Sequence, residues 1–303
     1  MGLFDRSAGV RVAVAPGVVR PRQAVTATIT TDKPLDNVTS VRLEWGYDNV
    51  YRYHWAGRVD SAAAAANDTL WTAGQVGTNY GGERDTEDWV CVTRVDVPMA
   101  TDEFTGTTST FTVPSWAPGS SEHIARWSCR LTVERGGRDV DTCGDFTVVI
   151  GVEDVDPVEA LQAPMELVSG AAETELDIVL PGSVFRAGAM LAGHVVLTPR
   201  VDLPDGDLAV HWQRHRESHP LVRQPAAAGE VDGRMVQLGK GIQLKAGASL
   251  TLPFDLTLPD DASPTADAVH SSLSWFIVAR LFYAGFSAHS VERVRRPIIV
   301  ANA

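Results

Sequence analysis

The chain has 303 residues, of which 44% are hydrophobic and 21% charged, and its formal net charge is −12. The hydrophobic content excludes an intrinsically disordered chain, and the length is sufficient for two domains with separate cores. An acidic surface repels phosphates, so we expect no nucleic acid among the partners. The longest apolar stretches, such as residues 273–279, are too short to span a membrane.

The first six residues lack the basic and then apolar layout of a secretory signal, which favours a cytoplasmic protein. Three cysteines are an odd number and too few for a disulfide framework. Cys129 and Cys143 flank a predicted hairpin turn at residues 136–137. With that turn as the centre, Cys129 lies opposite Gly144, so the two thiols are neighbours rather than a direct pair. A reduced protein is the better interpretation, and a bridge between Cys129 and Cys143 stays open.

Apolar and polar residues alternate along much of the chain, which is the pattern of half-buried strands. Proline and glycine interrupt the alternating runs at short intervals, as in all-β sandwiches. The clearest runs are residues 10–14, 25–30, 41–45 and 90–97.

Helical periodicity is weak throughout. The best candidate is Pro157 to Leu167, which has Asp156 as N-cap and proline at the first helical position. The alanine run at residues 62–66 is assigned to a loop, because a glycine-rich stretch follows it.

An internal repeat is the most informative feature of the sequence. The offset between matched segments is nearly constant except for one drop of 24 residues, which places an insertion in the first copy. The matched segments are 19–29 with 185–195, 41–45 with 210–214, 111–114 with 256–259, and 127–133 with 275–281.

The repeat predicts two β-sandwiches of one design. The first covers residues 1–153 and carries an inserted loop at about 56–110. The second covers residues 154–303. The join falls near residues 153–156, where acidic residues interrupt the strand pattern.

Five aromatic residues alternate with other residue types in the first half. On one long strand all five rings would share a face and could form a platform for sugars. A hairpin turn at Asp48-Asn49 would split them, and the turn chemistry favours that option. The residues are Trp45, Tyr47, Tyr51, Tyr53 and Trp55.

Three histidines, His211, His215 and His219, have a spacing that would converge on a metal only on a helix. The repeat predicts a strand here, where adjacent members are about 13 Å apart, so we predict no metal site. The chain has no G-x-S-x-G elbow, P-loop or dinucleotide fingerprint. We therefore predict neither catalytic residues nor a cofactor.

Contacts with other proteins remain the best prediction. The inserted segment contains Trp71 and Tyr80, rings of the kind enriched at interface hot spots. Together with Tyr51, Tyr53 and Trp55 they are the candidate partner-binding residues. An uninvolved loop has equal weight. Sheet edges also suit strand addition, and a homodimer through them stays open.

The second half carries a family pattern. Gly188, Leu191, Gly193, Val195 and Leu197 open it, the segment 247–259 ends in Leu-Pro-Phe-x-Leu-x-Leu-Pro, and an aromatic-led strand at 272–281 completes it. The pattern resembles the arrestin-like fold and, within it, the bacterial sporulation-control proteins. In the first half Arg22 and Gln23 replace the expected glycine, and Ala27 replaces the buried one.

This resemblance implies two immunoglobulin-like sandwiches joined edge to edge, without a catalytic centre. It also implies a regulator or scaffold that acts through protein contacts in sporulation, developmental or stress control. The alternative function is a carbohydrate- or ligand-binding β-sandwich module.

Overall fold

The structure is a computed structural model that describes residues 9–56, 81–156, 164–285 and 289–302. Most of these residues lie in strands, and antiparallel sheets pack as sandwiches, which confirms the predicted all-β fold. In this part of the chain the helical content is one 3-10 turn, η1 (Val152–Asp154), and no helix is long and apolar enough to cross a membrane.

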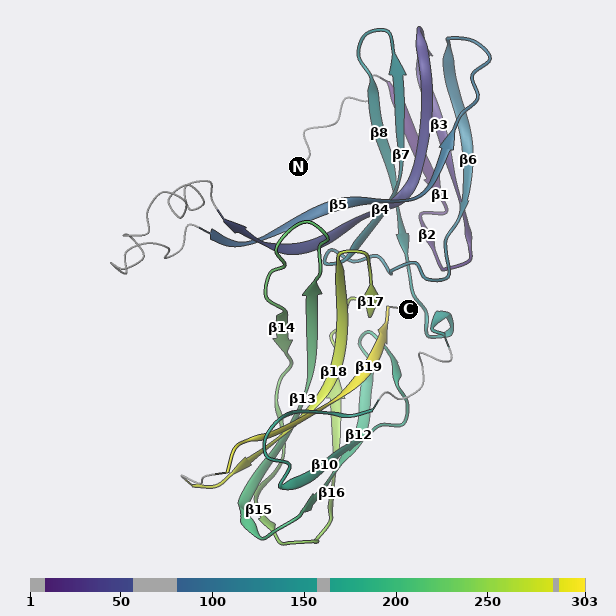
Figure 1. Cartoon of the computed structure of the whole chain (residues 1–303). Helices are drawn as coiled ribbons and strands as arrows, with labels where there is room; N and C mark the ends of the chain where they lie inside the picture. Colours follow the sequence, from purple (N-terminus) through teal and green to yellow (C-terminus); the bar gives the residue numbers. More distant parts are fainter. Residues whose placement is uncertain (1–8, 57–80, 157–163, 286–288, 303) are drawn as a thin grey trace, which may run out of the picture.

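Strands β1 to β8 form two facing sheets, which we call the N-terminal half (Figure 1). The smaller sheet has the order β1 (Val10–Ala15), β3 (Ala24–Leu35), β6 (Phe104–Thr112). The larger has the order β2 (Val18–Val19), β8 (Val140–Val148), β7 (Ala125–Arg135), β4 (Val38–Ala56), β5 (Gly81–Asp96).

Strands β9 to β19 form the C-terminal half. Its smaller sheet has the order β10 (Thr174–Val179), β12 (Met190–Pro199), β16 (Leu250–Thr257). The larger has the order β11 (Val184–Arg186), β19 (Glu292–Ala301), β18 (Ser271–Tyr283), β13 (Leu203–Ser218), β14 (Gly229–Asp232). Three further strands pair with these: β9 (Glu166–Ser169), β15 (Val236–Leu244) and β17 (Ala266–Asp267).

The two halves share one strand order, which confirms the repeat read from the sequence. Even the parallel pair is repeated, as β2 with β8 and β11 with β19. The matched tryptophans also have one role: the indole N–H of Trp127 donates to the Pro118 carbonyl, and that of Trp275 to the Ser263 carbonyl. Each bond ties a core strand to the proline-rich loop before it. The domain boundary at residue 153 stays a prediction.

The predicted helix at 157–167 falls mainly on residues 157–163, which lie outside the described part of the chain. Its last residues belong to β9 and are extended. The loop residues 62–66 also lie outside the described part.

Strand β4 runs unbroken from Val38 to Ala56, so the predicted hairpin turn at Asp48-Asn49 is wrong. Turn propensity is overridden here because the backbone of both residues is paired on each side, with β5 and with β7. The side chains are engaged too: Asp48 pairs with Arg130, and the Asn49 amide is fully buried.

Much of the predicted insertion at 56–110 is strand rather than loop. Residues 81–96 form β5, and β6 begins at Phe104. Alternation is weak at residues 83–88 because this part of β5 pairs only with β4 among the described strands and is largely exposed. We call the pair formed by β4 and β5 the ribbon. In Figure 1, β4 and β5 bend away from the sandwich towards Ala56 and Gly81.

The cysteines are unpaired, and Cys129 lies opposite Gly144, as the sequence predicts. Cys129 is buried and Cys143 is exposed. Burial raises the pKa of the Cys129 thiol to about 12, so this group is unreactive near neutral pH.

A β-bulge at Gly46 offers a test of the ribbon's geometry. The register shifts between Trp45, opposite Thr93, and Gly46, opposite Cys91. A Cβ at Gly46 would collide with the backbone carbonyl of Val90, whereas one at Gly82, also in the ribbon, meets nothing. We expect Gly46→Ala to lower the free energy of unfolding by about 2 kcal/mol, measured by urea denaturation. A loss no larger than that of the control Gly82→Ala would contradict this packing.

Candidate functional site: the junction of the two halves

The end of strand β4, which belongs to the N-terminal half, contacts the C-terminal half. Strand β7 pairs with β4 only as far as Asn49, which leaves the next residues of β4 without β7 on that edge. The connection between β13 and β14, residues 219–228, lies against this edge, and we call it the strap. Tyr53 and Pro225 form an antiparallel bridge, and the His54 amide donates to the Gln224 carbonyl at 2.9 Å. The strap thus adds a short extended segment to β4.

A buried asparagine joins both halves at the start of this contact. The Asn49 amide nitrogen donates to the Ile124 carbonyl at 2.9 Å and to Ser271 Oγ at 2.8 Å. Its oxygen accepts from the His270 backbone amide at 2.6 Å. Ser271 Oγ in turn donates to the Val50 carbonyl at 2.8 Å. The amide is fully satisfied, which a buried polar group requires, and its partners come from both halves.

Tyr51 lies next to this group and is also fully buried. Its hydroxyl donates to Asp88 Oδ2 at 2.6 Å, and its ring centroid is 5.2 Å from that of His270. Burial, together with the bond to Asp88, raises the pKa of Tyr51 to about 12. The phenol is therefore neutral and acts as a hydrogen-bond donor at physiological pH.

Charged pairs lie along the ribbon beyond the Asn49 contact. Arg216 and Asp85 lie 2.9 Å apart, and Arg52 pairs with Glu83 within the ribbon. Glu83 also accepts from the Ala227 amide of the strap at 3.0 Å. Solvated pairs of this kind each contribute little stability. They orient the ribbon on the C-terminal half more than they stabilise the contact.

The structure uses the predicted aromatic residues mainly within the chain. Tyr51 is enclosed, and its ring is not available to a partner in this conformation. Tyr53 is half-buried under the guanidinium of Arg223, 4.8 Å away, and Trp55 is half-buried beside Arg84, 4.0 Å away. The candidates Trp71 and Tyr80 lie outside the described residues, and their role in binding stays a prediction.

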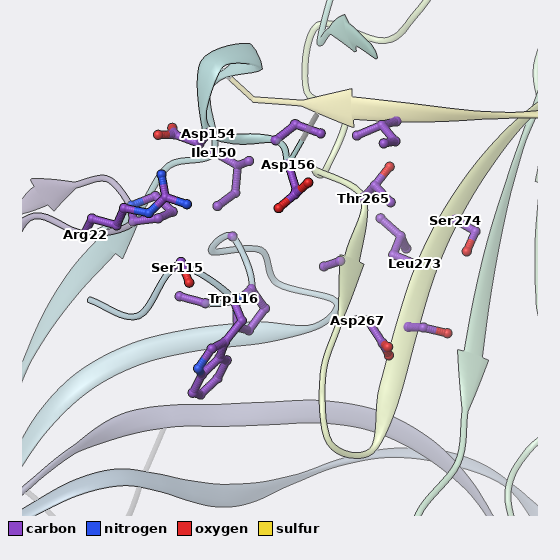
Figure 2. A pocket seen from close by; sticks show the side chains of 18 residues that line it. Arg22, Ser115, Trp116, Ile150, Asp154, Asp156, Thr265, Asp267, Leu273 and Ser274 are labelled. Atoms are coloured by element: carbon purple, nitrogen blue, oxygen red, sulfur yellow. The ribbon is translucent and has the colours of Figure 1, made fainter. Parts of the chain in front are cut away.

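The halves do not meet edge to edge along the whole junction. A half-open cleft of about 800 Å³ separates them on one side. Figure 2 shows Arg22, Ser115 and Trp116 on its N-terminal wall, Thr265, Asp267, Leu273 and Ser274 on its C-terminal wall, and Asp156 between them. We call this space the junction cleft.

The sequence did not identify the junction cleft. Trp116 stands in the proline-rich loop before β7, and its ring is 60% exposed. The only hint was Arg22, a departure from the glycine pattern. Arg22 has a φ of 68°, and its counterpart Gly188 has a φ of 73°. The N-terminal half therefore has an arginine in a left-handed backbone conformation, which is unfavourable for residues other than glycine.

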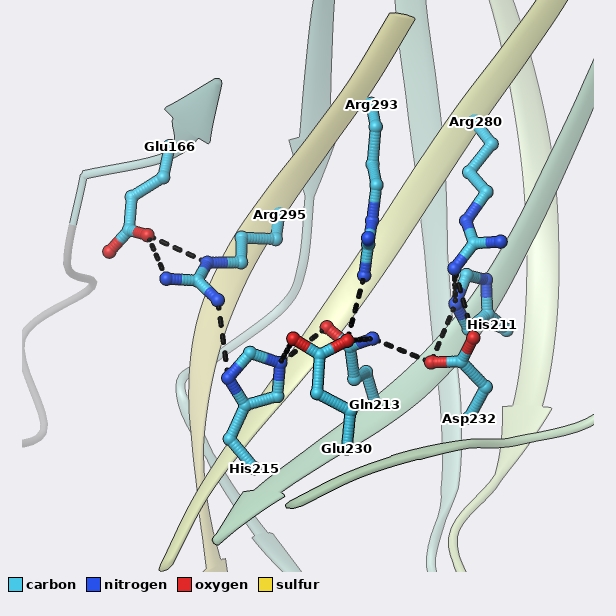
Figure 3. A network of polar contacts seen from close by, with 9 residues as sticks. All are labelled: Glu166, His211, Gln213, His215, Glu230, Asp232, Arg280, Arg293 and Arg295. Carbon is cyan, nitrogen blue, oxygen red and sulfur yellow. Dashed lines mark hydrogen bonds and ion pairs between the residues drawn. The ribbon is translucent and has the colours of Figure 1, made fainter. Parts of the chain in front are cut away.

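Two of the histidines, His211 and His215, lie in a polar network on the larger sheet of the C-terminal half (Figure 3). His211 and His215 are on β13, as predicted, and His219 follows the strand. The Gln213 amide donates to Asp232 Oδ1 at 2.6 Å and to Glu230 Oε2 at 3.2 Å, and its oxygen lies 2.7 Å from His215 Nε2. Three arginines complete the network, namely Arg280, Arg293 and Arg295.

The arginine contacts of this network favour neutral histidines, whereas the Nε2 atoms of His211 and His215 also lie 3.5 Å from Asp232 and 3.4 Å from Glu230. Arg280 can only donate, so His211 Nε2, 3.2 Å away, accepts. His215 Nδ1 likewise accepts from Arg295 at 3.4 Å, while its Nε2 donates to Gln213. Burial first, and the arginine charges next to it, lower the pKa of His211; burial also lowers that of His215. Among the described residues no His, Cys, Asp and Glu side chains are grouped to hold a metal ion.

Comparisons with known proteins assign no function to this site. No family model matches the chain, and no curated protein matches it significantly.

The Asn49 contact predicts how firmly the halves are joined. In Asn49→Ala the His270 amide loses its bond, while the Ile124 carbonyl and the Ser271 hydroxyl each keep one bond, to the Val50 amide and the Val50 carbonyl. We expect a loss of about 3 kcal/mol in the free energy of unfolding. The control Thr26→Ala removes an exposed hydroxyl contact with Thr110 and should cost under about 0.5 kcal/mol. Equal losses in denaturant titrations would contradict the role given to Asn49.

The histidine network predicts the response to acid. A folded-state pKa below the ordinary value near 6.5 means that the unfolded chain binds more protons, so stability falls as the pH drops below that value. Each histidine contributes a slope of up to about 1.4 kcal/mol per pH unit. His123, whose pKa burial also lowers, adds in the same direction.

Unfolding titrations between pH 7 and 5 measure this slope. We expect the double variant His211→Gln/His215→Gln to flatten it, leaving the part due to His123. An unchanged slope in the double variant would show that these histidines titrate freely.

Proposed function

We propose that the chain is a non-enzymatic regulator or scaffold that acts through protein–protein contacts in the cytoplasm. The resemblance to arrestin-like sporulation-control proteins supports a role in a sporulation, developmental or stress programme. The unpaired cysteines support a reducing compartment.

The ribbon is the observation that carries this proposal. One edge of β4 already holds an extended segment, the strap, by backbone hydrogen bonds. The outer edge of β5 has no strand partner along Gly81–Asp96 among the described residues. Unpaired strand edges are templates for strand addition by another chain. The stretch from Val90 to Val95 is the less charged part of this edge and suits such a partner best.

Affinity capture from the native host tests the proposal with three forms of the full chain. The wild type should retain a defined partner. A variant in which a short glycine–serine linker replaces residues 58–80 removes Trp71 and Tyr80 while keeping both ribbon strands. It should retain at least about tenfold less partner if these rings are hot spots. The control inserts the same linker at Gly137, an open turn, and should bind normally.

Hydrogen exchange then locates the contact. Binding of the captured partner should slow exchange in the β5 segment from Val90 to Val95. No retained protein, together with binding of soluble polysaccharide that Trp55→Ala or Tyr53→Ala abolishes, would contradict the proposal. It would identify a carbohydrate-binding module instead.

A further inference from the structure

The free edge of β6 is a surface that the ribbon does not use. Strand β6 ends the smaller sheet of the N-terminal half, and among the described strands it pairs only with β3 (Figure 1). Its sequence from Phe104 to Thr112 is rich in threonine and contains no charged residue and no proline. Charged residues and proline are the usual protection of a free strand edge, whose unpaired backbone groups would otherwise bind another chain. This edge has neither protection.

The hydrogen bonds of Val113 show which backbone groups face this edge. The Val113 amide donates to the Gln23 carbonyl at 2.9 Å, and its carbonyl accepts from the Arg22 amide at 2.7 Å. Residues alternate in an antiparallel ladder, so every second residue before Val113 bonds to β3 in the same way. The residues between them point their N–H and C=O groups to the free edge. These residues are Thr108, Thr110 and Thr112, whose side chains are exposed.

The matched strand of the C-terminal half, β16, has a protected edge. In the repeat, Thr108 corresponds to Pro253 and Thr110 to Asp255. The Leu258 amide donates at 3.0 Å to the residue before β12, so the same alternation places Pro253 and Asp255 at the free edge of β16. Proline has no N–H to donate and aspartate adds a charge, and both disfavour the addition of a strand. One half therefore blocks an edge that the other half leaves open.

We propose that β6 pairs antiparallel with β6 of a second copy of this chain, around a two-fold axis at Thr110. Thr110 then faces its own counterpart, and Thr108 faces Thr112 of the second copy. Each of the three resulting pairs exchanges two N–H···O=C bonds, about six in all. Any other antiparallel register aligns fewer of the outward-facing residues. Gly106, whose φ is 138°, and Pro114, which has no N–H, bound the stretch that can pair.

The composition of this edge favours a second copy over an unrelated chain. The outward-facing residues are identical and lie symmetrically about Thr110, so one interface satisfies both copies equally. Opposed threonines are favourable cross-strand pairs, and β3 already makes one, with 3.1 Å between Thr26 Oγ1 and Thr110 Oγ1. Residues 24–31 of β3 are uncharged too. Repulsion between two chains of net charge −12 therefore comes from more distant residues, where salt screens it.

Sedimentation velocity of the full chain at about 10 to 500 μM tests this proposal. A single strand pair buries little area, so we expect a weak dimer with a dissociation constant on the order of 100 μM. The variant Thr108→Pro/Thr110→Asp gives β6 the residues of β16 and should weaken the dimer at least about tenfold. Pro253 shows that the shared architecture accepts proline at this position. The control Thr28→Asp adds the same charge at the exposed residue opposite Thr108 and should stay within about twofold of wild type.

Hydrogen exchange and salt then identify the contact. Exchange at the amides of Thr108, Thr110 and Thr112 should slow as the protein concentration rises. An increase in salt from about 50 to 500 mM should strengthen the dimer, because salt screens the repulsion between the chains and leaves the backbone bonds. If the double variant fails to fold, Thr110→Asp alone gives the same comparison with Thr28→Asp.

Four outcomes would overturn the proposal. They are a wild type that stays monomeric over the whole range, a dimer that the double variant leaves intact, a dimer that salt weakens, and slowed exchange at Val90–Val95 in place of β6. A monomeric wild type whose captured host protein is lost in the double variant would assign the edge to a different chain. Slowed exchange at Val90–Val95 would place the dimer at the ribbon. The first two outcomes leave the capture of a partner by β5 unaffected.

Discussion

The side chain of Asn49 is the point on which the arrangement of the two halves depends. It lies on β4 where β7 ends, and its amide bonds one group of the N-terminal half and two of the C-terminal half. An unpaired amide in this buried position would be costly, so the contact is either complete or absent. The strap lies against the stretch of β4 that follows this contact.

The two halves share one architecture and differ at residues that form the junction. Each ties its core tryptophan to the proline-rich loop, and each has the same left-handed turn before its second strand in the smaller sheet. In the C-terminal half that turn uses Gly188, the residue that fits it best. In the N-terminal half it uses Arg22, whose side chain lines the cleft. The departure from the shared pattern thus coincides with the N-terminal wall of the junction cleft.

The sequence predicted the features that depend on local pattern. Alternation predicted the strands, the repeat predicted a strand at His211 and His215, and the Gly136 turn placed Cys129 opposite Gly144. It failed at Asp48-Asn49, because turn propensity is a local preference and the pairing partners of these residues lie far away in the chain. Asn49 and Ser271 are 222 positions apart, and no spacing rule relates them. The cleft was missed for the same reason, since its walls come from segments far apart in the chain.

A distance measurement between the halves tests the central claim most directly. Spin labels at Thr108→Cys in β6 and Thr251→Cys in β16, with the exposed Cys91 and Cys143 replaced by serine, report the separation by pulsed electron resonance. Two halves fixed by Asn49 should give one narrow distance distribution, which broadens in Asn49→Ala. A distribution that is already broad in the unsubstituted chain, or one that Asn49→Ala leaves unchanged, would contradict the account.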